Sequence, residues 1–239
     1  MTGTGDVTHA PGGARADLVA LCERSARGEV HGPSLPALVP DGPATVARPA
    51  AVLVLFGVLD AALAAAPPIG ATHVASDLDV LLQRRAGTLR SHPGQISFPG
   101  GRIEPEDAGP EAAALREAAE ETGLDPTGVE VLGTLPPVAV AVSRHVVTPV
   151  PAWWTRPSTV AAVDHAETVD VFRVPVADLL DPARRASVSV RDGRVRVPAF
   201  VLDDDVVVWG FTAWVLDLVF DQVGWTLAWD RDRLVERPR

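Results

Sequence analysis

Three glutamates stand three and four residues apart in the segment 116–124, at Glu117, Glu120 and Glu121. On an α-helix, residues at this spacing share one face, so the three carboxylates would form a cluster. Like charges so placed repel by about 0.2–0.5 kcal/mol per pair. A hard divalent cation that prefers oxygen ligands, Mg²⁺ or Mn²⁺, would offset this repulsion. The cluster therefore predicts a metal site, although taken alone it is also compatible with a solvated acidic helix face.

The glutamates require a helix to carry them, and the sequence supplies both of its ends. Pro110 suits a first helical turn, and Gly123 is a favoured residue just past a helix end. Further helices are predicted over 14–27 and 211–220 and a hairpin at Asp192-Gly193. The mixed order of elements favours an α/β sandwich on a mixed sheet. Strands are predicted over 51–56, 80–83, 95–98, 129–135, 146–154, 169–174, 187–190 and 195–208.

Composition limits the classes of function. The chain has 239 residues, 47% of them hydrophobic, which is enough for one sizeable core. Its net charge of −10 argues against nucleic-acid binding, which depends on a basic surface. The single Cys22 allows no disulfide within the chain, and the start of the sequence lacks a secretory signal pattern. We therefore expect a cytoplasmic protein with no membrane partner, whose oligomeric state, a homodimer included, stays open.

The segment around the glutamates resembles the Nudix box. That motif runs from a glycine through five residues to an acidic residue, and after a spacer to Arg-Glu-apolar-any-Glu-Glu-any-Gly-apolar. Here Gly101 is followed after five residues by Asp107. A spacer of eight residues then separates Asp107 from the stretch Arg116–Leu124. Two features depart from the usual box, because Asp107 replaces glutamate and the spacer has eight residues rather than seven. The resemblance implies a Nudix-like α/β/α sandwich with a mixed sheet over 49–239. Residues 1–48 show no such resemblance, and their composition predicts an extension with a helix and a Pro/Gly-rich tether.

Both departures are usual in one branch of the family, the coenzyme A pyrophosphatases. That branch also carries a signature before the box, which this chain matches from Leu81 to Gly101. Arg85, Arg90 and Phe98-Pro99-Gly100-Gly101 fall at fixed positions, whereas Gln83 stands where the branch has threonine. The resemblance extends more weakly towards the C-terminus.

The resemblance assigns roles to individual residues. It implies that Glu117, Glu120, Glu121 and the carbonyl of Gly101 bind Mg²⁺ or Mn²⁺, and that Arg85 and Arg90 contact substrate phosphates. Arg116, Asp107, Gly100 and Gly123 would support the site structurally. Glu120, Glu121 and the downstream Glu167 are candidates for the catalytic base. His92 and the pair Trp153-Trp154 are more easily explained as structural residues.

The implied reaction is metal-dependent hydrolysis of the diphosphate in coenzyme A or acyl-coenzyme A. The products would be 3′,5′-ADP and 4′-phosphopantetheine or its acyl form. Two alternatives stay open. The first is the same chemistry on another nucleoside diphosphate derivative, such as ADP-ribose or NADH. The second is a catalytically silent domain that binds nucleotides.

Overall fold

A mixed β-sheet forms the centre of the computed structural model, which describes residues 11–31, 48–58, 77–87, 94–140, 143–190, 193–203 and 206–237. The sheet has the order β3-β2-β1-β7-β5, with β8 paired to β2, β4 to β1 and β6 to β7. β1 and β7 run parallel, and the remaining pairs are antiparallel. The strands are β1 (Arg48–Val58), β2 (Leu78–Arg85), β3 (Ile96–Ser97), β4 (Gly100–Arg102), β5 (Val129–Val131), β6 (Val138–Val140), β7 (His145–Trp154) and β8 (Thr168–Pro175).

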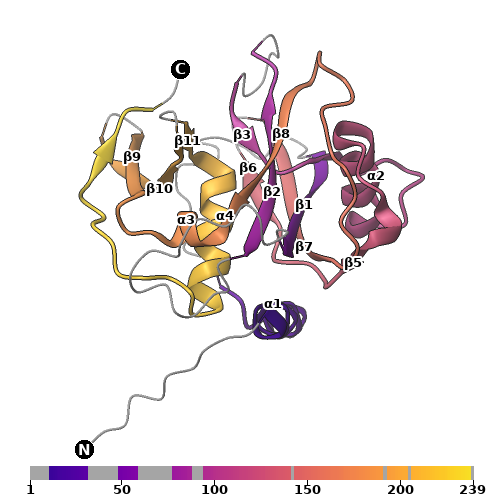
Figure 1. Cartoon of the computed structure of the whole chain (residues 1–239), viewed down its shortest axis with the longest axis horizontal. Coiled ribbons are helices and arrows are strands. Elements are labelled where there is room, and N and C mark those ends of the chain that lie inside the picture. Colours follow the sequence, from indigo (N-terminus) through magenta and orange to yellow (C-terminus); the bar gives the residue numbers. More distant parts are fainter. Residues whose placement is uncertain are drawn as a thin grey trace, which may run out of the picture.

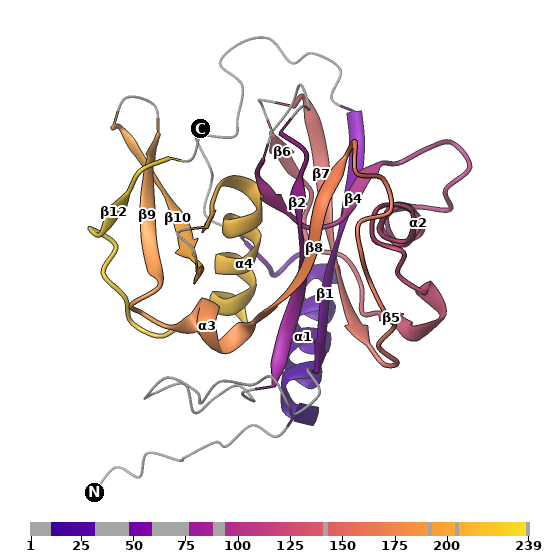
Figure 2. The same ribbon diagram turned by 45° about the horizontal axis from the view of Figure 1, so that its top comes forward.

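Helices cover both faces of this sheet, which confirms the predicted α/β/α sandwich. Helix α2 (Pro110–Thr122) lies on one face and α4 (Gly210–Gln222) on the other (Figure 1). A second, four-stranded sheet lies beyond α4 and was not predicted (Figure 2). Its strands are β9 (Arg185–Val190), β10 (Val195–Val201), β11 (Val207–Val208) and β12 (Leu234–Val235). The short helix α3 (Val176–Leu180) connects β8 to this second sheet. In the central sheet, the 3-10 helix η1 (Pro126–Gly128) precedes β5.

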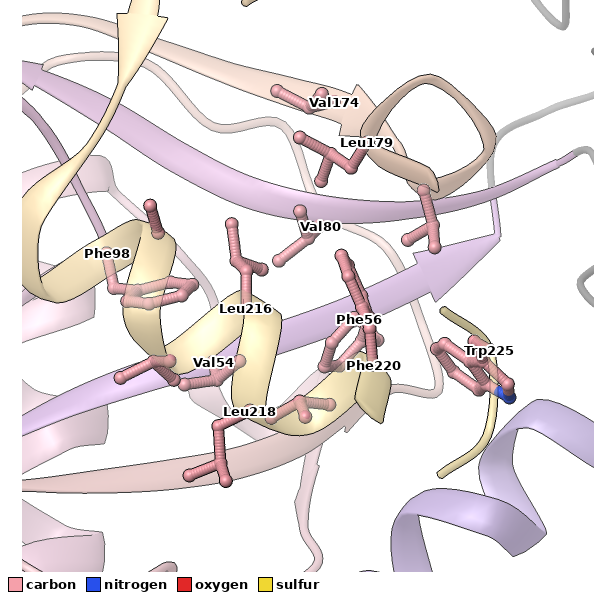
Figure 3. Close-up of a cluster of buried hydrophobic side chains, with 14 of the residues drawn as sticks. Val54, Phe56, Val80, Phe98, Val174, Leu179, Leu216, Leu218, Phe220 and Trp225 are labelled. Carbon is pink, nitrogen blue, oxygen red and sulfur yellow. The ribbon is translucent and has the colours of Figure 1, made fainter. Parts of the chain in front are cut away.

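The larger hydrophobic core lies between the central sheet and α4. Phe56 and Val80 from the sheet meet Leu216 and Phe220 from the helix (Figure 3). Helix α4 is apolar on most of its circumference because it is enclosed by both sheets. A second core packs α2 against the opposite face of the central sheet through Leu53, Leu81, Ala114, Ala118 and Trp154.

Helix α1 (Pro11–Ala26) belongs to the larger core. Leu18 and Leu21 are fully buried, and Asp17 accepts a hydrogen bond from the indole of Trp225 at 3.0 Å. The predicted helix over 14–27 is therefore confirmed. The boundary between an extension over 1–48 and a domain over 49–239 stays a prediction, and most of the tether lies outside the described residues. None of the helices within the described ranges is long and apolar enough to cross a membrane.

Some predicted elements differ from the observed ones. The strand predicted over 95–98 is observed at Ile96–Ser97, and Gly100 and Gly101, which were not predicted to lie in a strand, pair with β1 as part of strand β4. The strand predicted over 129–135 ends at Val131, and the single strand predicted over 195–208 is divided by a turn in which the Leu202 amide donates to the Val206 carbonyl. The sequence carries a signal at both places that these strand predictions passed over: Gly133-Thr134 follow Val131, and Asp203-Asp204-Asp205 stand between Leu202 and Val206.

Candidate active site

The acidic face of α2 lies against β4, and the helix also contacts β8 and Gln83 in the second half of β2. The helix ends as predicted at Gly123, whose φ of 68° is left-handed and whose amide donates to the Ala119 carbonyl. Its last two turns carry all three glutamates of the motif. Each of the three has a different environment.

Glu121 is the most buried of the three, with 7% of its surface exposed. Its Oε2 accepts hydrogen bonds from the Gly100 amide at 2.9 Å and from Nε2 of Gln83 at 2.7 Å. Burial nevertheless raises the pKa of Glu121 to about 7, although these donors and the nearby charge of Arg85 oppose the shift. Glu121 is therefore a desolvated carboxylate whose negative charge the protein offsets only in part.

Glu117 lies directly against the backbone of Gly101. A Cβ atom added to Gly101 would come within 2.4 Å of the Glu117 carboxyl carbon and within 2.5 and 2.6 Å of its two oxygens. Only glycine leaves room for this approach. Burial raises the pKa of Glu117, and the charges of Glu120 and Glu167 add to the shift. Glu167 therefore lies within electrostatic range of the cluster.

Arg116 connects the glutamate cluster to Asp107. Its guanidinium binds Asp107 through two nitrogens at 2.9 and 3.0 Å, and it donates to the Arg102 carbonyl at 3.0 Å. The same guanidinium contacts Glu117 at 3.1 Å and Glu120 at 3.3 Å. Asp107, whose pKa is lowered mainly by the hydrogen bond from Arg116, therefore anchors the arginine that orients the glutamates.

The remaining predicted site residues lie around this cluster or outside the described part. Glu120 is largely exposed. Arg85 is half-buried on the α2 face of β2, and its Nε donates no hydrogen bond to the described residues. Arg90 and His92 lie outside the described residues. Trp153 and Trp154 are buried in the two cores, as a packing role requires.

The donor set at this site fits a hard divalent cation. Glu117, Glu121 and the Gly101 carbonyl are all oxygen donors, and the two carboxylates are desolvated. Among the described residues, no three acidic, histidine or cysteine side chains already form a metal cluster. Arg116 contacts both Glu117 and Glu120, and Gln83 donates to Glu121.

A family model described as the NUDIX domain matches residues 66–191, which is more than half of the chain. The chain belongs to the Nudix family. Nudix hydrolases generally require divalent metal ions, in agreement with the donor set of this site.

Curated relatives of this Nudix hydrolase include bacterial proteins. It is 38% identical over 146 residues to a protein of Cronobacter sakazakii named "Uncharacterized Nudix hydrolase NudL", covering 61% of this chain and 75% of the relative. The protein of the same name from Escherichia coli K12 is 37% identical over 146 residues, with the same coverage. Among solved structures, RenU, a Nudix hydrolase from M. smegmatis, shares 26% identity, with a TM-score of 0.42 over 56% of this chain and 74% of that one.

Two residues of this Nudix site were not predicted as functional from the sequence. Gln83 donates to Glu121, and Thr168 donates from its hydroxyl to Oε1 of Gln83 at 3.2 Å. Gln83 was noted only as a departure from the branch signature. The signal that could have marked it is a polar residue inside a buried strand, a signal that it shares with the buried Asp79 of β2.

Proposed function

We propose that the chain hydrolyses the diphosphate of coenzyme A or an acyl-coenzyme A, giving 3′,5′-ADP and 4′-phosphopantetheine or its acyl form. One observation carries the proposal. Arg85, from the signature before the Nudix box, lies close enough to Glu121 for its charge to lower that carboxyl's pKa. The two motifs that point to this substrate class thus meet at a single site.

Glu117, Glu120, Glu121 and the carbonyl of Gly101 would hold Mg²⁺ or Mn²⁺. A bound divalent cation neutralises phosphate charge and lowers the pKa of bound water. Arg116 keeps Glu117 and Glu120 in place through its own anchor at Asp107. Gly100 contributes its amide, which holds Glu121.

Arg85 would bind a phosphate oxygen of the substrate. Its Nε makes no hydrogen bond to the described residues, and a guanidinium suits a phosphate. Arg90 is proposed as a second phosphate contact on the strength of the motif alone. In the reaction, the oxygen of water bonds to one phosphorus as the bridging P–O bond breaks, and Glu120, Glu121 or Glu167 accepts the proton of that water.

A substrate panel tests the proposal. Coenzyme A, 3′-dephospho-coenzyme A, ADP-ribose and NADH are compared at equal concentration with Mg²⁺ and with Mn²⁺, and the products are separated chromatographically. We expect coenzyme A to give the highest kcat/KM and to yield 3′,5′-ADP. Equal turnover of dephospho-coenzyme A and ADP-ribose would assign the chain to another Nudix substrate. No turnover of any compound, together with nucleotide binding, would identify a silent domain.

A further inference from the structure

Gln83 is a buried amide where the surrounding packing calls for an apolar residue. It lies on β2 two residues after Leu81, so both side chains point to the α2 face of the sheet. Leu81 belongs to the apolar core beneath α2, whereas Gln83 is fully buried and polar. Burying an amide costs free energy unless its polar atoms are paired. Both ends of this amide are paired, and one of the partners is Glu121.

The direction of these hydrogen bonds follows from the chemistry of the groups. An ionised carboxylate only accepts hydrogen bonds, so the NH₂ group of Gln83 faces Glu121. The carbonyl Oε1 of Gln83 is then left for the hydroxyl of Thr168, which donates to it. The donors from Gln83 and Gly100 both converge on Oε2 of Glu121. Neither of these two donors contacts the other oxygen, Oε1, so a cation at this site would bind Glu121 through Oε1.

A β-bulge brings Thr168 within reach of Gln83. Along β2 and β8, Arg84 pairs with Asp170 but Arg85 pairs with Thr168, so Val169 is an extra residue on β8. In a regular ladder Thr168 would point to the opposite face of the sheet. The bulge turns its side chain to the α2 face, where it is 1% exposed, while Val169 stays 51% exposed.

We infer that Gln83 is a positioning residue that orients Glu121 for metal binding, and that Thr168 acts on the site only by holding Gln83. This inference rests on the proposed metal role of Glu121. Because Glu167 directly precedes Thr168, the first residue of β8, the same link restrains the position of this candidate base. Gln83 itself is anchored on both sides, since it pairs with Ser97 of β3 and Val171 of β8.

Mn²⁺ binding to the full chain without substrate tests whether Gln83 orients Glu121 and whether Thr168 acts only through Gln83. Free Mn²⁺ is measured by electron paramagnetic resonance for the parent chain and for Q83L, T168V and the double variant. Leucine preserves the volume of the glutamine without its amide, and valine preserves the shape of threonine without its hydroxyl. We expect Q83L to weaken Mn²⁺ binding about 10-fold or more, as loss of a residue that orients a ligand typically does. T168V should weaken it about 3-fold, since it removes one hydrogen bond to Gln83.

The double variant discriminates between positioning and mere packing. If Thr168 acts through Gln83, Q83L/T168V binds Mn²⁺ no more weakly than Q83L alone. T168S, which keeps the hydroxyl, should bind as the parent does. Unchanged Mn²⁺ affinity in Q83L, or effects that multiply in the double variant, would overturn the inference. Loss of stability in urea with unchanged affinity would show a packing role only.

E121Q in the same titration separates this inference from the proposed function. If E121Q weakens Mn²⁺ binding and Q83L does not, Glu121 is supported as a metal ligand and the positioning role of Gln83 is refuted. If E121Q binds as the parent does, Glu121 is not a ligand and both fall. The substrate preference is decided by the panel of diphosphates and does not affect this measurement.

Discussion

Replacing Gly101 with alanine places one methyl group against the carboxylate of Glu117. The new Cβ would lie 2.4 Å from the carboxyl carbon, whereas ordinary contact begins near 3.4 Å. The backbone of Gly101 cannot retreat freely, because it pairs with Ala51 of β1. The Glu117 carboxylate must therefore move by about 1 Å, which is the scale of misplacement that can cost a reaction about 100-fold.

The expected result for G101A is a fall in kcat of about 100-fold, equivalent to about 2.7 kcal/mol of transition-state stabilisation. Stability should not fall with it. Gly101 does not have a positive φ, so alanine fits its backbone and restricts the unfolded chain, a gain of about 0.4–1 kcal/mol in favourable cases. Turnover of coenzyme A with Mg²⁺ and urea unfolding are measured on the same preparation.

Two comparison variants make this prediction specific. Gly87 also lacks a positive φ, and a Cβ there would meet nothing within 4 Å, so G87A should keep parental turnover. Gly100 has a φ of 153°, and its Cβ would lie 2.3 Å from the Ala51 carbonyl oxygen, so G100A should instead lose about 2–3 kcal/mol of stability. Parental kcat in G101A would refute the reasoning, because it would mean that catalysis tolerates a displaced Glu117.

Three further predictions concern ionisation, anchoring and the core. Burial raises the pKa of Glu121 from 4.5 to about 7, so without metal this group should cost up to about 3 kcal/mol of stability as pH rises from 4.5 to 7; E121Q should remove that loss in urea unfolding at pH 5 and pH 8, and equal pH dependence in both proteins would contradict it. R116K should lower kcat at least about 10-fold, because lysine cannot make the paired contacts with Asp107; parental kinetics would show that Arg116 does not orient the glutamates. L18A should lower the free energy of unfolding by about 2–4 kcal/mol with kcat unchanged below the transition, since Leu18 is fully buried in the larger core; unchanged stability would mean that α1 contributes little to the fold.

The helix that carries the glutamates could be predicted from the sequence because its signals are local. Pro110 and Gly123 mark its ends, and the spacing of the glutamates fixes their common face. Arg116 was likewise predicted to orient a glutamate, and it contacts Glu117 in the next position and Glu120 one turn away.

Contacts between distant segments could not be predicted in the same way. Thr168 is 85 residues from Gln83, and their contact depends on a bulge whose extra residue, Val169, has no distinctive sequence signal. Gly100-Gly101 was not assigned to a strand because glycine carries no side chain to show a strand's alternation. Its pairing with β1 depends on the register of a strand about 50 residues earlier in the sequence. The second sheet also depends on which strands pair, and hydrophobicity does not encode this.

The central position of β1 has a practical consequence for anyone who isolates the family-matched region. The matched residues begin at 66, after β1 has ended at Val58. A fragment cut at that boundary would lack the strand between β2 and β7, and with it the pairing partner of β4. Gly101 would then have no ladder to hold it against Glu117. Such a fragment would retain every residue of the recognised motif and still lack the backbone support of its proposed metal site, so its inactivity would say nothing about the chemistry of the full chain.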